Sequence, residues 1–191
     1  MPRPQTDARD RILAVADDLF YQDCVRAIGI DTIIAKSEVA KTTLYRYFPS
    51  KDDLVVAYLE GRNQRFWQLF EEAVNLYAGN PKQQLLAIFA WLDEMIADPE
   101  NCGCPFLITA TEFPETNYPG HQVAIAHKQK MRDRLTELAD LAGIEQAEEL
   151  SAALLMLADG AFAERRLFQK HDNGVRLEKA AAKMIQAYGS N

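Results

Sequence analysis

Hydrogen-bond donors and aromatic rings gather in one short stretch of the chain, residues 41–47, which contains no acidic side chain. The polar members of this stretch are Lys41, Thr42, Thr43, Tyr45, Arg46 and Tyr47. Leu44 and Phe48 are four residues apart, so they share one face of a helix and can pack it onto a core. Donors and aromatic rings on the other faces match the phosphate oxygens and base edges of a DNA major groove. The stretch therefore predicts a helix that reads duplex DNA.

The residues on either side complete a recognisable motif. Pro49 ends the helix, because the residue before a proline is kept out of the α region. Ser50 is a good N-cap for the next helix, with Asp53 at the capping-box position. Upstream, residues 31–36 predict a partner helix, which the turn of residues 37–39 joins to the first. Two short helices joined in this way form a helix-turn-helix, whose second helix enters the major groove.

The run from Gly29 to Leu59 reads GIDTIIAKSEVAKTTLYRYFPSKDDLVVAYL and resembles the DNA-binding domain of the tetracycline-repressor (TetR) family of bacterial regulators. The family usually carries glycine in the turn, where this chain has Glu38. Glycine suits that position because it enters the left-handed conformation without penalty. A glutamate costs on the order of 1 kcal/mol there, and it adds a negative charge close to the DNA.

The resemblance implies that Thr42, Thr43 and Tyr45 read the groove, and that Tyr47 and Lys51 hold phosphates. It also implies a homodimer that places two recognition helices in successive major grooves of a near-palindromic operator, about 34–36 Å apart or a multiple of that distance. A small-molecule inducer, whose identity the sequence does not give, would bind the body, shift the connecting helix and release the DNA. Most members of the family repress transcription, so repression is expected here.

Three further residues complete the predicted DNA-binding set. Arg46 can read guanine or contact phosphate, and Lys41 has the same two options. Thr32 lies at the start of a helix, where contact with phosphate is electrostatically favoured. Leu44 and Phe48 are expected to be structural.

Composition places the chain among globular proteins of the reducing cytoplasm. Of its 191 residues 48% are hydrophobic and 26% charged, which is ordinary for such a protein. No apolar run approaches the roughly eighteen residues needed to cross a bilayer, and residues 1–7 lack the apolar segment of a signal peptide. Three cysteines fit a reducing compartment better than a disulfide framework. We therefore expect a cytoplasmic location and no membrane partner.

The net charge of −7 argues against general affinity for nucleic acid. The basic side chains of Lys36, Lys41, Arg46 and Lys51 nevertheless cluster around the predicted recognition helix. A local basic patch can bind DNA on an acidic protein, because screening limits charge interactions to about 8–10 Å at physiological salt. The overall charge should mainly weaken non-specific binding.

The sequence predicts an all-α protein, because glycine and proline separate stretches with helical spacing of apolar residues. It contains no alternating strand pattern and no internal repeat. A three-helix helix-turn-helix head in residues 1–50 is expected to be joined by a long helix to a helical ligand-binding and dimerisation body in residues 51–191. Gly61 weakens the middle of the long helix and is a candidate bend.

Glycine, proline and capping residues set the expected helix ends. The last helix should be capped by Asp172 or Asn173 and should end at Gly189. A short helix should begin at Pro105 and end before Pro114. The remaining helices are expected over residues 6–20, 31–36, 41–48, 51–77, 83–97, 119–141 and 147–168.

The last two helices are apolar on more than one face, so each must pack against more than one neighbour. One face can complete the subunit core and the other can form a two-fold four-helix interface, as the resemblance also implies. The alternative is that both faces are buried within the monomer. The predicted interface residues are Leu154, Leu157, Ala158, Ala161, Ala181, Met184, Ile185 and Tyr188.

Aromatic side chains of the body are candidates for an inducer pocket. At helical spacing, aromatic residues are more often core residues than ligand contacts. The candidates are Trp67, Phe70, Phe89, Trp91, Phe106, Tyr118 and Phe162.

The only closely spaced cysteines, Cys102 and Cys104, leave alternatives open. A metal site is disfavoured because no second cysteine pair exists and the nearest histidines, His121 and His127, do not share a helical face. A redox-sensing thiol pair is a stronger alternative, and packing as small apolar groups is stronger still. Cys104 with either histidine and Glu112 could be drawn as an enzyme, but nothing in their spacing enforces proximity. We expect no enzyme activity and no cofactor, and interpret the GCPF and EFP segments, which resemble family segments, as scaffold.

Overall fold

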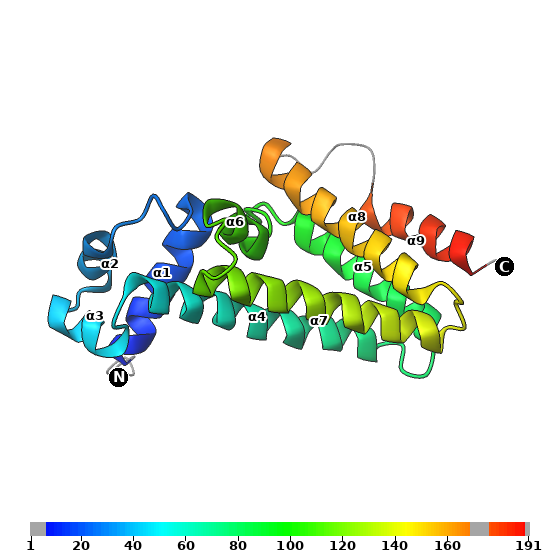
Figure 1. Cartoon of the computed structure of the whole chain (residues 1–191), viewed down its shortest axis with the longest axis horizontal. Helices are drawn as coiled ribbons and strands as arrows, with labels where there is room; N and C mark the ends of the chain where they lie inside the picture. The colour runs from blue at the N-terminus through cyan, green and yellow to red at the C-terminus, as the bar shows by residue number, and fades with distance from the viewer. Residues whose placement is uncertain (1–6, 169–175, 190–191) are drawn as a thin grey trace, which may run out of the picture. The chain divides into compact units, whose positions relative to one another are not determined.

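The computed structural model describes residues 7–168 and 176–189, and these residues form nine α-helices and no strand (Figure 1). The all-α prediction is therefore confirmed. The helices are α1 (Ala8–Asp23), α2 (Ile30–Ser37), α3 (Lys41–Tyr47), α4 (Lys51–Asn75), α5 (Pro81–Ala97), α6 (Pro105–Glu112), α7 (Pro119–Leu141), α8 (Ala147–Phe168) and α9 (Leu177–Tyr188). None of the described helices combines the length and apolar character that a bilayer crossing requires.

All of the predicted helices are present, and the ends of α1 to α6 differ from the predicted ranges by at most three residues. The helices α7 and α8 have the expected bounds, whereas α1 continues three residues beyond Phe20. Gly61 is helical within α4. The expected caps Asp172 and Asn173 lie outside the described residues, and α9 begins at Leu177 with Arg176 as its N-cap.

The chain divides into two compact units, and each is discontinuous in sequence. The head unit comprises Met1–Asn63 and Pro105–Ile125, and the body unit comprises Gln64–Cys104 and Ala126–Asn191. These compact units differ from the predicted division after Ser50, because α6 and the beginning of α7 pack with the head. The functional division into residues 1–50 and 51–191 stays a prediction.

A small core holds the first three helices of the head unit together. Ile12 and Phe20 of α1, Ile33 of α2 and Leu44 of α3 are all buried. The ring of Phe20 meets the ring of Tyr58 edge-on, with centroids 5.6 Å apart. This core fixes α2 and α3 against α1, as the helix-turn-helix prediction requires.

Within the body unit, α5, α8 and α9 pack against one another (Figure 1). The carboxylate of Asp93 on α5 is only 2% exposed. It accepts a hydrogen bond from the amide N–H of Leu177 at 3.1 Å and another from Nε of Arg176 at 2.8 Å. A buried carboxylate on α5 thus caps the N-terminus of α9, where the helix dipole favours negative charge.

Candidate nucleic-acid interface

The turn between α2 and α3 adopts the geometry that glycine would favour. Glu38 lies in the left-handed region, at φ 53° and ψ 42°, and its amide N–H donates to the carbonyl of Ile34. Its side chain is exposed, so the substitution adds no buried charge and its cost is the backbone strain of about 1 kcal/mol. The hydroxyl of Ser37 donates to the carbonyl of Ile33 at 2.6 Å, which holds the end of α2.

Helix α3 has the two faces that its sequence predicts. Leu44 is 0% exposed and Phe48, directly after the helix, is 3% exposed, so both are core residues. Tyr45 is 40% exposed. Of the other predicted DNA-binding residues, Thr32, Lys41, Thr42 and Arg46 are exposed, while Thr43, Tyr47 and Lys51 are half-buried. The structure thus presents a polar surface on α3 over a buried apolar face.

The start of α4 carries the predicted capping box. The hydroxyl of Ser50 accepts from the amide N–H of Asp53 at 3.1 Å, and the Asp53 carboxylate accepts from the amide N–H of Ser50 at 2.9 Å. Two amide groups at the helix start are thereby satisfied reciprocally. This box fixes the start of α4 directly after the helix-turn-helix.

Three of the predicted DNA contacts are engaged within the head. Lys41 Nζ lies 3.2 Å from a carboxylate oxygen of Asp31, and the hydroxyl of Tyr47 donates to Asp7 at 3.1 Å. The guanidinium of Arg46 lies over the Tyr47 ring, 5.0 Å from its centroid. These contacts lie at the surface, where ion pairs are weak and can be exchanged for DNA phosphates.

Lys51 makes a hydrogen bond within the head unit that the sequence did not predict. Its Nζ donates to the carbonyl of Val25 at 2.7 Å and lies 5.8 Å from the centroid of the Phe20 ring. Burial lowers the pKa of Lys51, while the charges of Glu112 and Asp52 act in the opposite direction. An ammonium group has three donors, so the predicted phosphate contact of Lys51 stays a prediction beside this structural role.

A carboxylate from outside the helix-turn-helix also contacts the head. The two oxygens of Glu112, the last residue of α6, accept from the amide N–H groups of Val25 and Arg26, each at 2.9 Å. These partners are 87 and 86 residues apart in the chain, and no local sequence pattern could have paired them. The EFP segment that we interpreted as scaffold therefore makes a specific polar contact.

The predicted inducer-pocket residues separate into two groups. Phe106 and Tyr118 belong to the head unit, where the ring of Tyr118 stacks on Phe113 with centroids 4.2 Å apart. Phe89 and Phe162 are buried in the body unit. The set of seven is therefore not one compact cluster within a single unit, and its role in ligand binding stays a prediction.

An aromatic cluster in the body unit brings together Trp67, Phe70 and Trp91 with Phe66 and His127. The ring of Phe66, which sequence reasoning missed, lies 5.1 Å from Trp91 and 4.8 Å from His127. Burial, assisted by Lys128 and Lys130, lowers the pKa of His127 to about 3. His127 is therefore neutral at physiological pH. The indole Nε1 of Trp67 is buried and has no hydrogen-bond partner among the described residues.

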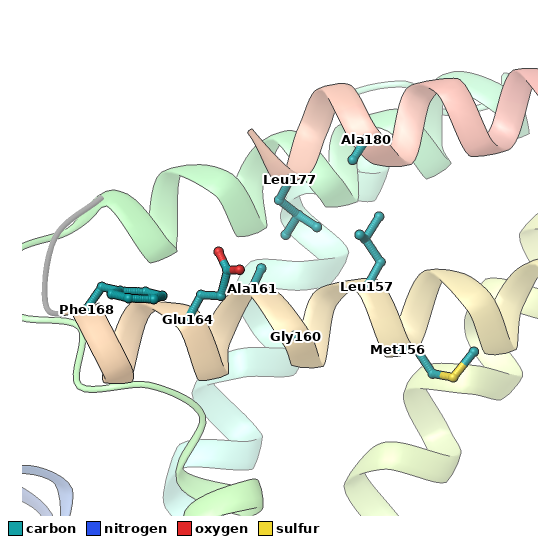
Figure 2. Close-up of a pocket in the computed structure, with 8 residues that line it drawn as sticks. All are labelled: Met156, Leu157, Gly160, Ala161, Glu164, Phe168, Leu177 and Ala180. Carbon is teal, nitrogen blue, oxygen red and sulfur yellow. The ribbon is translucent and has the colours of Figure 1, made fainter. Parts of the chain in front are cut away.

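An open groove of about 700 Å³ lies between α8 and α9 (Figure 2). Figure 2 shows the side chain of Leu157 on α8 pointing toward Ala180 on α9, with Leu177 beside it. The lining residues are Met156, Leu157, Gly160, Ala161, Glu164, Phe168, Leu177 and Ala180. None of them was predicted for the inducer pocket, whereas Leu157 and Ala161 were predicted for the dimer interface.

The predicted dimer interface divides between core and surface. Leu154, Ala158, Ala181 and Ile185 are at most 1% exposed. They pack within the core of their own subunit, and their contact with a partner stays a prediction. Leu157, Ala161, Met184 and Tyr188 are half-buried and stay predicted interface residues. The sequence set also omitted three strongly exposed residues of α8, namely Met156 at 68%, Leu167 at 74% and Phe168 at 53%.

The cysteine and histidine candidates occupy ordinary packing environments. Cys104 is 7% exposed and Cys102 is half-buried, with Gly103 between them at φ 101°. Nδ1 of His121 lies 2.7 Å from the carbonyl of Phe113. Within the described ranges, no three histidine, cysteine or acidic side chains come close enough to hold a metal ion.

Comparison with known proteins agrees with the geometry. Residues 12–58 match the family model of the bacterial regulatory proteins, tetR family. The crystal structure of SCO4454, a TetR-family transcriptional regulator from Streptomyces coelicolor, superposes with a TM-score of 0.83 at 30% identity, over 96% of this chain and 94% of that chain. The matched family model and this superposition identify a transcriptional regulator. The chain belongs to the TetR family.

A second relative is the HTH-type transcriptional repressor NemR of Escherichia coli. The two sequences are 30% identical over 83 residues, which are 44% of this chain and 42% of NemR. The chain thus spans less than half the length of the curated relatives that it matches first. The reduced form of NemR superposes with a TM-score of 0.78 at 17% identity, over 96% of this chain and 98% of that chain, which shows a shared fold.

Proposed function

We propose that the protein is a ligand-responsive repressor that binds a palindromic operator as a homodimer. The observation that carries this proposal is α3, whose exposed donors and Tyr45 stand over a core formed by Leu44 and Phe48. The name of NemR as a transcriptional repressor supports repression as the direction of control. Thr42, Thr43 and Tyr45 would read bases, and Tyr47 and Lys51 would hold phosphates.

The surface of α8 and α9 supports assembly into a dimer. Met156, Leu167 and Phe168 expose large apolar side chains along α8, and the groove between α8 and α9 has a largely apolar lining. Apolar patches of this kind are characteristic of protein contacts. A second copy would cover them with the same helices in a two-fold arrangement.

The aromatic cluster of the body supports the response to a small molecule. The rings of Phe66 and Trp67 lie beside the neutral His127, and those of Phe70 and Trp91 lie beside Phe66. The buried indole N–H of Trp67 lacks a hydrogen-bond partner among the described residues. A buried unpaired donor costs about 1–3 kcal/mol, and a ligand with an acceptor atom would relieve that cost. We therefore propose an apolar inducer that carries a hydrogen-bond acceptor for the indole N–H of Trp67.

Selection of DNA from a random-sequence duplex pool by the purified protein tests the proposal. We expect one near-palindromic sequence to be enriched, and a protein with Thr42→Ala and Tyr45→Ala to enrich nothing. Release of the selected duplex by members of a metabolite collection would identify the inducer. A wild-type protein that enriches no sequence would contradict the proposal.

A thiol-based signal is the second candidate, in which Cys102 and Cys104 replace the small molecule as sensor. Cys102 is half-buried rather than buried. Arg166 on α8 donates to the carbonyl of Cys102 at 2.9 Å, so oxidation that displaces Cys102 would alter a contact of α8. The solved NemR structure is of a reduced form. Loss of operator binding in peroxide, reversal by dithiothreitol, and insensitivity of Cys102→Ser would favour this candidate. Equal peroxide sensitivity of the variant would exclude it.

A further inference from the structure

The carboxylate of Glu112 fixes the connection between α1 and α2. Oε2 accepts from the amide N–H of Val25 and Oε1 from that of Arg26, both at 2.9 Å. Hydrogen bonds from amides to an ionised carboxylate are among the stronger ones in proteins. The carbonyl of Val25 in turn accepts from Nζ of Lys51 at 2.7 Å. Val25 is therefore held through both its N–H and its carbonyl, and it is only 1% exposed.

The residues that follow Glu112 strengthen the same junction. The guanidinium of Arg26 lies over the ring of Phe113, 4.7 Å from its centroid. Phe113 stacks on Tyr118, whose hydroxyl donates to Asp52 at the start of α4 at 3.1 Å. The segment after α6 thus contacts both the connection that precedes α2 and the helix that follows α3.

The position of this junction determines what it can influence. The connection held by Glu112 leads through Ile28, which is buried, into α2, and α2 packs on α3. Residues 25–26 thus lie only three or four residues before the first helix of the helix-turn-helix. The side chain of Glu112 does not belong to the surface of α3 and needs no contact with DNA to act.

We propose that Glu112 is a positioning residue for DNA binding, which holds the α1–α2 connection so that α2 and α3 fit the groove. The inference rests on the proposed function and deepens it by naming a residue outside the helix-turn-helix that positions its two helices.

The substitution Glu112→Gln distinguishes a positioning role of the carboxylate from a general effect of its negative charge on DNA binding. Glutamine keeps the size of the side chain but loses the charge and places an NH2 group where one amide needs an acceptor. Removing a negative charge would by itself strengthen DNA binding. If Glu112 positions α2 and α3, the substitution should instead weaken DNA binding. The affinity should fall about tenfold if the arrangement that binds DNA falls to about a tenth of the population.

Salt dependence distinguishes a positioning residue from a phosphate contact. Because Glu112→Gln removes no phosphate contact, the slope of log affinity against log salt should stay at the wild-type value. Lys51→Ala is the contrasting variant, whose slope should fall by about 1 if Lys51 also binds phosphate. The matched control is Glu115→Gln, an exposed acidic residue three positions further on, which should bind at least as tightly as wild type.

The duplex selected by the wild-type protein is the probe, and amide hydrogen exchange is the second measurement. Together with weaker DNA binding, we expect Glu112→Gln to show faster exchange of the amide hydrogens of Val25 and Arg26. Its helicity should be unchanged. Equal or tighter binding of Glu112→Gln would overturn the proposal, and so would loss of helicity, which would make Glu112 a folding residue. A wild-type protein that selects no duplex would instead show that the proposed function itself is wrong.

Discussion

At the scale of single residues, Tyr45 and Phe48 are the most informative pair, since they are three positions apart and differ in exposure, 40% against 3%. We expect Tyr45→Ala to keep the fold and to weaken specific binding by about 1–3 kcal/mol, the value of one base contact. Phe48→Ala should destabilise the head by about 3–5 kcal/mol, because it leaves a cavity in the core. Thermal melts and binding isotherms of both variants check this, and equal melting temperatures would show that the faces of α3 are wrongly assigned.

His127 gives the protein a pH dependence with a definite sign. Its pKa is about 3 in the folded state, against 6.5 for the free side chain, so the unfolded chain binds the proton more tightly. The free energy of unfolding is therefore highest above pH 6.5. It decreases by about 1.4 kcal/mol per pH unit as the pH falls from 6.5 toward 3.

Urea unfolding at pH 7 and pH 5.5 measures this effect, with His127→Gln as the control that lacks the titrating group. Wild type should lose more stability than the variant between the two pH values. Identical losses would mean that His127 is not buried in its neutral form.

Residue-scale prediction from sequence succeeded where the cause is local. The faces of α3 follow from a spacing of four residues, and the bonds between Ser50 and Asp53 follow from a spacing of three. The bond of Lys51 to Val25 and the two bonds of Glu112 join residues 26 to 87 positions apart. Such pairs are decided by packing, and a single sequence does not encode them as a pattern.

At the scale of helices, the cap of α9 is a contact between elements. Asp93→Ala would leave the buried N–H of Leu177 without an acceptor, which should cost about 1.5–3 kcal/mol as the loss of a charged hydrogen bond. The amides at the start of α9 should exchange faster. Glu94→Ala, at the exposed neighbouring position, should change stability by no more than about 0.5 kcal/mol. Similar effects of the two substitutions on unfolding in urea would refute the capping role.

Helix boundaries were predictable where glycine or proline marks them. Pro119 starts α7, and Gly143 follows its end in a left-handed conformation. The start of α9 was not predictable from capping preferences, because its acceptor comes from Asp93, 84 positions before Leu177. A side chain that is distant in sequence therefore caps α9, which capping preferences of neighbouring residues do not predict.

At the scale of the whole molecule, assembly depends on which face of α8 meets a partner. Leu157 is half-buried on the groove between α8 and α9, whereas Leu154 is 0% exposed. Leu157→Glu should therefore give a folded helical monomer that binds the operator poorly. Leu154→Glu should lose helicity, because an unpaired charge in a core costs several kcal/mol.

Sedimentation and circular dichroism of the two variants distinguish interface from core. Loss of helicity in both would place Leu157 in the core as well. A wild-type protein that sediments as a monomer at micromolar concentration would contradict the dimer.

The central claim is sequence-specific binding of duplex DNA by the α3 surface. Its most direct test is the ratio of wild-type affinities for the selected duplex and for a duplex of the same composition in scrambled order, at one fixed salt concentration. We expect a ratio of at least about 10³, as specific regulators show, and a collapse of that ratio in Tyr45→Ala. Equal affinities of the wild-type protein for the two duplexes would contradict the account.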